Sequence, residues 1–311
     1  MEEEVLDCRL EPGMGIDRLL DCYDRIHGFM AGHLAAAASL LEEALADSEV
    51  RIITFTGNLV ATGLRGILAQ LLEEGLFNVV FTTAGAIDHD IARHEGGRYL
   101  KGFFEADDSG LLESGIHRLG NVFIPVDSYG PRVEGFVRRL ASEASKRKGV
   151  WGVFELLELA GRMMEGDGNS ILAAAAKSGA RIFVPGWADG AFGTALFMER
   201  QRGVGITVDY FRDMKELSDI FFSERGKAAA LIVGGGISKH HAIWWSQFRG
   251  GLDYVVYVTT AVEYDGSLSG AHPREAVSWG KVKAGSRRTV VYGDATIVLP
   301  VLSYKLLYGR M

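Results

Sequence analysis

Residues 228–248 read AAALIVGGGISKHHAIWWSQF and contain the pattern that decides the fold. An apolar run, Ala228–Val233, leads directly into three consecutive glycines and then into a helical pattern. A short apolar run is typical of a buried strand, and glycines permit the tight turn that joins a strand to a helix. This stretch therefore predicts a strand, a glycine turn and a helix in succession.

The same unit recurs along the chain. Apolar runs at Arg51–Phe55, Asn78–Thr82 and Arg181–Val184 are each followed by a turn of small residues and a helical pattern, and Tyr254–Val258 and Thr289–Tyr292 are further strand candidates. This succession predicts an α/β fold with a doubly wound, mainly parallel, Rossmann-like sheet and helices on both faces. In such a sheet, ligands bind at the carboxyl ends of the strands.

The N-terminal part has a different pattern. Residues 14–47 show helical periodicity, with apolar side chains recurring at steps of three and four. We therefore expect an N-terminal helical arm over residues 1–48, followed by one α/β domain over residues 49–311. No low-complexity segment separates the two.

Charge and composition exclude several classes of protein. The 311 residues include 33 Lys and Arg against 40 Asp and Glu, a net charge of −7, which argues against a nucleic-acid partner. No basic, apolar leader begins the chain and no apolar run is long enough for a membrane span, so we expect a cytoplasmic protein. Two cysteines, Cys8 and Cys22, exclude a disulfide framework and a Cys-rich zinc site, and we expect no metal.

The glycine turns are the first candidate binding elements. The turn at residues 234–236 exposes backbone N–H groups at the start of a helix, which suits a phosphate or pyrophosphate. A plain tight turn explains this segment alone equally well, since it lacks the GxGxxG pattern. Residues 56–58 and 82–85 form similar turns after strands. The three turns together favour a nucleotide-type cofactor.

Two side chains are candidates for catalysis. His240 follows the glycine turn and is suited to act as a general base, whereas adjacent His241 points elsewhere on the helix, so the pair does not predict a metal site. Lys281 lies beside Trp279 after a long loop rich in glycine and serine, and an aromatic wall favours the neutral amine that forms an imine. The alternatives are a packing histidine and a surface lysine.

The chain strongly resembles the deoxyhypusine synthases. The resemblance is carried by ALIVGGGISKHH and the stretch up to SWGK within residues 230–281. Further motifs follow in the family's order: HGFMAGHLAAA at 27–37, TGNLVATG at 56–63, TTAGAIDHD at 82–90, SGIHRLGN at 114–121, WADGAFGT at 187–194 and YGDA at 292–295. The resemblance covers most of the chain.

This resemblance implies an NAD-dependent aminobutyl transferase that works as a homotetramer. Such an enzyme oxidises the polyamine spermidine, holds the aminobutyl group as an imine on its own lysine, and passes it to a lysine of the hypusine-containing translation factor. The resemblance implies that Lys281 forms the imine, that His240 is the base, that Trp279 packs on the amine chain and that Glu275 anchors an ammonium group. The implied NAD contacts are Asn58, Thr83, Ala84, Gly85, Asp189, Gly234, Gly235, Thr260, Asp265, Asp294 and Ala295.

Four positions depart from the family. Thr194 and Leu268 stand where the family has acids, Trp244 where it has Asn, and His89 where it has Glu. The first three belong to the implied amine site, where lost counter-charges weaken binding of a tricationic substrate. Three interpretations follow: spermidine is still used, another amine such as agmatine or putrescine is used as in homospermidine synthesis, or the chain is a silent NAD-binding paralogue.

Overall fold

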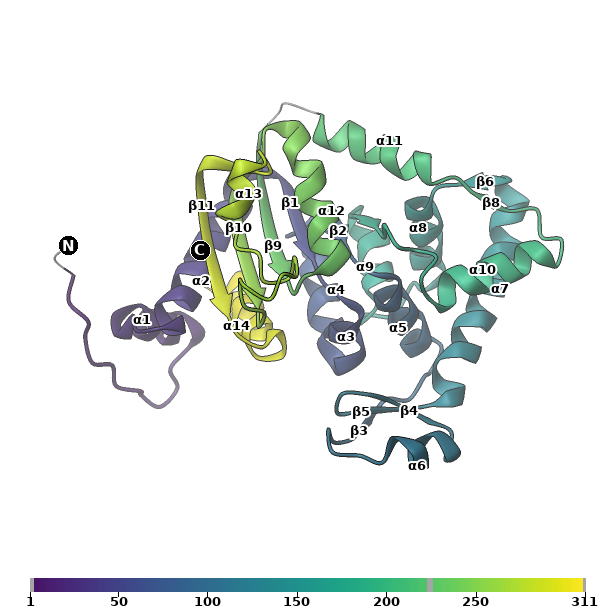
Figure 1. Cartoon of the computed structure of the whole chain (residues 1–311), viewed down its shortest axis with the longest axis horizontal. Coiled ribbons are helices and arrows are strands. Elements are labelled where there is room, and N and C mark those ends of the chain that lie inside the picture. Colours follow the sequence, from purple (N-terminus) through teal and green to yellow (C-terminus); the bar gives the residue numbers. More distant parts are fainter. Residues whose placement is uncertain (1–2, 223–225, 310–311) are drawn as a thin grey trace. The chain divides into compact units, whose positions relative to one another are not determined.

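The computed structural model describes residues 3–222 and 226–309, which divide into two units (Figure 1). The first unit contains residues 1–55, 76–79 and 218–311, and the second contains residues 56–75 and 80–217. The predicted border at residue 48 is not one of the borders between these units. The helical arm therefore stays a prediction, and Met1 and Glu2, with which it begins, lie outside the described residues.

A parallel sheet forms the core of the first unit. Its strands are β1 (Ser48–Thr54), β9 (Lys227–Val233), β10 (Leu252–Thr259) and β11 (Val282–Tyr292), in the order β11-β10-β9-β1. These are the runs that the sequence predicts as strands, and all but the first residue of β9 are buried because both faces of the sheet are covered. β2 (Val79–Phe81) begins in this unit and follows β1 in the strand order.

Helices cover this sheet. α2 (Met30–Asp47) packs along β9, β10 and β11 and on α14 (Ala295–Tyr308). Figure 1 shows α12 (Gly236–Ser246) in front of the strands and α2 behind them. The short elements are η3 (Gln247–Arg249) and α13 (Glu275–Ser278). These helices on both faces confirm the predicted doubly wound α/β class.

The N-terminal segment is tied to α1 (Ile16–Ile26). A disulfide joins Cys8 to Cys22, with their Cα atoms 5.6 Å apart, and the Leu6 N–H donates to the Arg25 carbonyl. The sequence excluded a framework of several bridges but did not predict this single one. The helical pattern predicted over residues 14–47 is interrupted at His27 and Phe29, where φ is +51°.

The second unit is built mainly of helices around short strands. β7 (Arg181–Phe183) follows β2 in the strand order, and the Thr82 N–H donates to the Phe183 carbonyl. The helices are α3 (Gly57–Leu59), η1 (Val60–Leu64), α4 (Arg65–Glu73), α5 (Ala84–His94), α7 (Gly130–Arg147), α8 (Val153–Met163), α9 (Ile171–Ser178) and α10 (Ala191–Gln201). α11 (Tyr210–Phe221) runs from this unit into the first.

Two smaller sheets complete the second unit. β3 (Leu100–Lys101), β5 (Val122–Pro125) and β4 (Ile116–Leu119) form an antiparallel sheet beside α6 (Asp108–Glu113) and η2 (Val126–Ser128), which the sequence did not predict. β6 (Val150–Trp151) pairs with β8 (Thr207–Val208).

No helix in the described residues is both long and apolar enough to cross a membrane.

Buried aspartates fix the starts of three helices in the second unit. Asp88 accepts from the N–H groups of Ala191 and Phe192 at 2.9 and 2.7 Å, at the start of α10. Asp90 accepts from the Leu172 N–H in α9, and Asp213 accepts from two N–H groups at the start of α8. A carboxylate at a helix N-terminus satisfies otherwise unpaired N–H groups, so these side chains set where each helix begins.

Candidate active site

Lys281 lies at the start of β11, and backbone hydrogen bonds fix it on both sides. Its N–H donates to the Ala276 carbonyl at 3.0 Å, and its carbonyl accepts from the Leu252 N–H at 3.1 Å. Gly280 before it has a φ of +67°, a conformation that favours glycine and that leads α13 into the strand. Because Leu252 pairs with Val282 at the beginning of two parallel strands, Lys281 lies at the amino end of the sheet, not at the carboxyl end where sequence reasoning expects ligands.

Two tryptophan rings flank the Lys281 ammonium group. Nζ lies 5.0 Å from the Trp279 ring centroid and 5.7 Å from that of Trp244. The residue is only 9% exposed, and within the described part of the chain its side chain has no hydrogen-bond or ion-pair partner. The ammonium group therefore lies against aromatic rings and not against a carboxylate, although Trp279 and Trp244 are themselves 65% and 43% exposed.

His240 lies on the same side of the sheet. Its ring stacks on Trp244 with centroids 6.0 Å apart, so the histidine and the lysine both contact the Trp244 ring. Desolvation lowers the pKa of His240 below its ordinary value, and the charge of Lys281 lowers it further. The imidazole is therefore neutral at pH 7 and able to accept a proton.

The loop 260–274 between β10 and α13 carries Asp265 and Leu268, and Glu275 follows it directly. Asp265 accepts from the Ser267 N–H at 2.7 Å, and Glu275 opens α13 at the end of the loop. Leu268 takes part through its backbone, because its carbonyl accepts from the Lys239 ammonium group at 2.7 Å. Sequence reasoning missed Lys239. Its position indicates burial, because Lys239 precedes Ala242 and Ile243 by three and four residues and so lies on the same apolar face of α12.

The predicted cofactor residues of the first unit gather at the carboxyl edge of its sheet. The Gly234 N–H donates to the Val258 carbonyl at 2.8 Å, which joins the turn after β9 to β10. The Gly293 N–H donates to the Thr259 carbonyl at 3.0 Å, which joins the turn after β11 to the same strand. The turns that these bonds bring side by side carry Gly234, Gly235, Thr260, Asp294 and Ala295.

The second unit brings its own predicted turns together. The Gly57 N–H donates to the Thr83 hydroxyl at 3.1 Å, and a Cβ on Gly57 would lie 2.8 Å from the Gly85 carbonyl carbon. Only glycine fits this close approach. The bond joins the turn that holds Asn58 to the turn that holds Ala84, with both helices starting from it.

Asp189 and Thr194 lie at the start of α10. Asp189 belongs to the turn that Asp88 holds, and Gly190 approaches so closely that a Cβ there would lie 2.5 Å from Asp88 Oδ2 and 2.8 Å from the Ala84 Cβ. Thr194 lines a cavity of about 310 Å³ in which Glu134 also lies. Glu134 has no ion-pair partner among the described residues, so an acid remains beside the position where the sequence has lost one.

His89, the fourth departure from the family, is buried and neutral. Its Nδ1 lies 2.6 Å from the Tyr99 hydroxyl oxygen, and its ring packs on Tyr129 with centroids 5.0 Å apart. Burial raises the pKa of Tyr99, so this hydroxyl donates and the imidazole accepts. Burial also lowers the pKa of His89 to about 4, and the charge of Arg93 lowers it further.

We expect His89 to make folding stability depend on pH. Between about pH 6.5 and 4 the histidine binds a proton in the unfolded protein but not in the folded one. The contribution of His89 to the free energy of unfolding is therefore fully present above pH 6.5 and is lost as the pH is lowered towards 4. In His89→Gln this dependence is absent. Between pH 6.5 and 5 the difference in unfolding free energy between the two proteins should change by about 2 kcal/mol, measured by denaturant titration. Exposed His117→Gln is the control, and an unchanged difference for His89→Gln contradicts a neutral folded His89.

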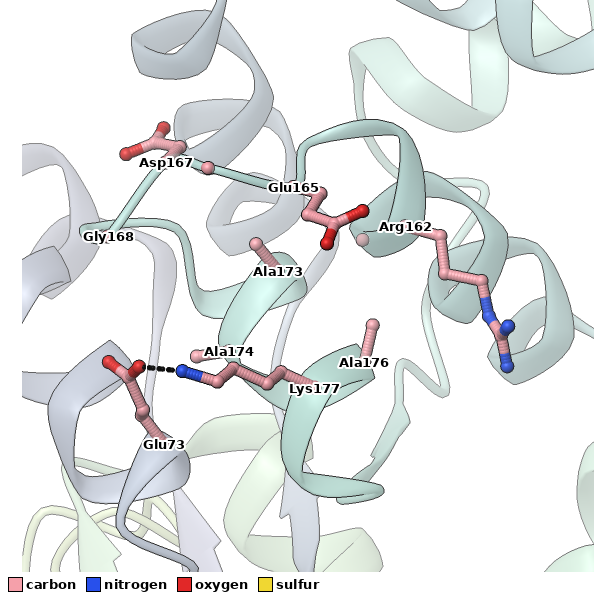
Figure 2. Close-up of a pocket in the computed structure, with 11 residues that line it drawn as sticks. Glu73, Arg162, Glu165, Asp167, Gly168, Ala173, Ala174, Ala176 and Lys177 are labelled. Atoms are coloured by element: carbon pink, nitrogen blue, oxygen red, sulfur yellow. Dashed lines mark hydrogen bonds and ion pairs between the residues drawn. The ribbon is translucent and has the colours of Figure 1, made fainter.

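A separate cavity of about 500 Å³ in the second unit contains none of the predicted residues. Figure 2 shows Lys177 reaching across it to Glu73, with which it forms an ion pair. Asp167 at its edge pairs with Arg65, and Arg162 pairs with Glu158. Because none of the predicted residues lines it, this cavity is not the predicted site.

Known proteins resemble this chain over its whole length. The family model described as "Deoxyhypusine synthase" matches residues 18–306. A curated relative from Aeropyrum pernix, named "Probable deoxyhypusine synthase", is 74% identical over 307 residues and the match covers 99% of each chain. Another of the same name, from Sulfurisphaera tokodaii, is 50% identical over 305 residues, 98% of this chain and 97% of its own. A crystal structure from Entamoeba histolytica assigned to the deoxyhypusine synthases has the same fold, with a TM-score of 0.67 at 18% identity, covering 99% of this chain and 100% of the other.

Proposed function

This chain belongs to the deoxyhypusine synthase family, and we propose that it transfers the aminobutyl group of spermidine, through an imine on Lys281, to a lysine of the hypusine-containing translation factor. The observation that carries the proposal is the state of Lys281. It is buried between two tryptophans without a hydrogen-bond or ion-pair partner in the described structure, and a neutral histidine stacks on one of those tryptophans. These are the features that an imine-forming lysine needs.

NAD is the cofactor in this proposal, and the glycine turns fit it. A Cβ on Gly236 would meet no atom within 4 Å, whereas Gly235 in the same turn is covered by Ser269, so this turn is open to a ligand on the side of Gly236. The residues proposed to hold NAD are those gathered in these turns, with Asp189 and Asp265. When bound, NAD supplies hydride acceptance from the amine carbon and hydride return at the end of the reaction.

Each residue near Lys281 has a proposed role. His240 takes the proton of the substrate ammonium group, so that the carbon next to a neutral amine becomes a hydride donor. Lys281, once it has lost its proton, attacks the oxidised carbon, the bond from that carbon to the secondary nitrogen of spermidine breaks, the three-carbon diamine leaves, and the aminobutyl group stays as an imine on Lys281. The acceptor lysine then attacks the same carbon, and Lys281 is released as the free amine. Trp279 and Trp244 offer ring faces to the cationic chain, and Glu275 anchors its far ammonium group.

The choice of amine rests on the altered positions. Thr194, Trp244 and Leu268 remove polar groups that the family resemblance leads one to expect, which favours a smaller or less charged amine such as putrescine or agmatine. Family membership supports spermidine, because the chain is 74% identical to a curated relative named "Probable deoxyhypusine synthase". We therefore favour spermidine and keep the smaller amines, with homospermidine-type synthesis, as the second candidate. A cytoplasmic homotetramer belongs to this proposal through family membership alone.

Borohydride trapping tests the proposal. We expect that incubation with NAD and spermidine, reduction, and peptide mass spectrometry will find an aminobutyl adduct on the Lys281 peptide and none on the Lys239 or Lys283 peptides. Adduct only from putrescine or agmatine assigns the second candidate. No adduct from any amine, while NAD still binds, contradicts the lysine-imine mechanism and leaves a silent paralogue.

A further inference from the structure

Lys239 is a buried cation that the proposed reaction leaves without a role. It lies on α12 and is only 1% exposed. Its Nζ donates to the carbonyls of Leu268 and Ala271 at 2.7 Å each, and lies 3.5 Å from the Ser269 carbonyl. The same atom is 4.2 Å from the centroid of the Tyr257 ring. A lysine ammonium group has three donors, so three carbonyls and one ring face fill its surroundings.

This arrangement replaces water around a buried charge. Among residues 3–222 and 226–309 no carboxylate bonds to Lys239, although the charge of Glu275 on α13 acts on it at longer range. Burial lowers the pKa of Lys239 to about 8. The other titratable groups that face it are Tyr257 on β10 and His272 on the loop. A buried ammonium group without a partner is costly, so its carbonyl partners are held firmly at the positions that satisfy it.

The three carbonyls lie close together in the loop 260–274. The Ser269 carbonyl also accepts from the Thr259 hydroxyl at 3.2 Å, which ties this point to β10. A Cβ on Gly235 would lie 2.2 Å from Ser269 Oγ, so the loop rests directly on the glycine turn. Segment 268–271 is therefore the place where the loop is fixed to the sheet and to α12. Asp265 lies before it and Glu275 after it, and both belong to the proposed site.

We infer that Lys239 is a positioning residue: its ammonium group holds the carbonyls of residues 268–271 and thereby sets the geometry of the loop that binds cofactor and amine. Its saturated surroundings also make it unavailable for imine formation, in contrast to Lys281. The predicted change in KM rests on the proposed function, whereas the predicted change in hydrogen exchange of the loop rests on the structure alone.

The test is Lys239→Met, which keeps the length of the side chain and removes its donors, read by amide hydrogen exchange and by kinetics. We expect exchange in residues 262–271 to become about 10- to 100-fold faster while β9 and β10 stay protected. The KM values for NAD and amine should rise by a similar factor, with kcat changed less. Lys239→Arg should restore part of both, because it keeps the charge and several donors.

The control is Lys227→Met, an exposed lysine of the same unit paired with Asp47. The inference is overturned if amide exchange in residues 262–271 is unchanged in Lys239→Met. It is also overturned if exchange in these residues becomes faster by the same factor in Lys239→Met and in the Lys227→Met control. Where Lys239→Met does not fold, Lys239→Gln serves instead: its amide group lies on a shorter side chain and carries no charge, so loop exchange and KM should change in the same direction but by less. Absence of any amine adduct in the wild type rejects the proposed function, whereas the loop exchange still decides the role of Lys239.

Discussion

Lys281→Arg is expected to lower aminobutyl transfer by roughly 10³-fold or more, in the range that loss of a catalytic nucleophile costs. Arginine keeps the positive charge and the contact with two tryptophan rings, but its guanidinium group is never neutral in a protein and cannot form the imine. The borohydride adduct should therefore disappear as well. Amine-dependent formation of NADH should fall much less, because removing a proton and a hydride from the amine needs His240 and the cofactor but not the lysine.

Lys283→Arg is the matched control for this substitution. Lys283 lies two residues further along the chain, in β11, and its ammonium group pairs with Asp253 at 2.7 Å. We expect its transfer rate to stay within about twofold of the wild type, as for other exposed ion pairs. Transfer by Lys281→Arg at the rate of this control would falsify the imine mechanism, and parallel loss of NADH formation and transfer would mean that the arginine disrupts amine binding instead.

The sheet could be predicted because its strands are local patterns. β9 and β10 contain the apolar runs Ala228–Val233 and Tyr254–Val258, and short runs of this length, rich in β-branched residues, are typical of strands buried on both faces. The strands β3, β4 and β5 are two to four residues long and partly exposed, too short for any period to be read. The break between α1 and α2 was missed for a related reason, since His27 and Phe29 adopt a positive φ without being glycine.

The site could be predicted only in part, since several of its features depend on contacts between distant segments. Lys281 and Trp279 are neighbours in sequence, so their contact follows from the chain itself. The contact of Lys281 with Trp244 joins residues on different elements, and no spacing announces it. Lys239 shows the same limit, because its partners are backbone carbonyls some thirty residues later, which leave no mark on residue type.

His240→Gln is expected to lower the rate of amine oxidation by about 10²- to 10⁴-fold, the usual contribution of a general base. The proton on the substrate ammonium group must leave before hydride transfer, and the neutral imidazole beside Trp244 is placed to take it. Unlike Lys281→Arg, this substitution should slow NADH formation and transfer together, because it acts on the step that precedes the imine. The pair of variants therefore separates oxidation from transfer.

The pH profile makes this assignment specific. The pKa of His240 lies below its ordinary value, so kcat/KM for amine oxidation should fall on the acid side of about pH 6.5 and be level above it, as far as this group decides. In His240→Gln that acid limb should vanish. His241→Gln is the control: His241 accepts from the Trp245 indole N–H at 3.1 Å, a packing contact that glutamine can retain, so its rate and profile should match the wild type. An acid limb that persists in His240→Gln and disappears in His241→Gln would transfer the role of base to the neighbouring histidine.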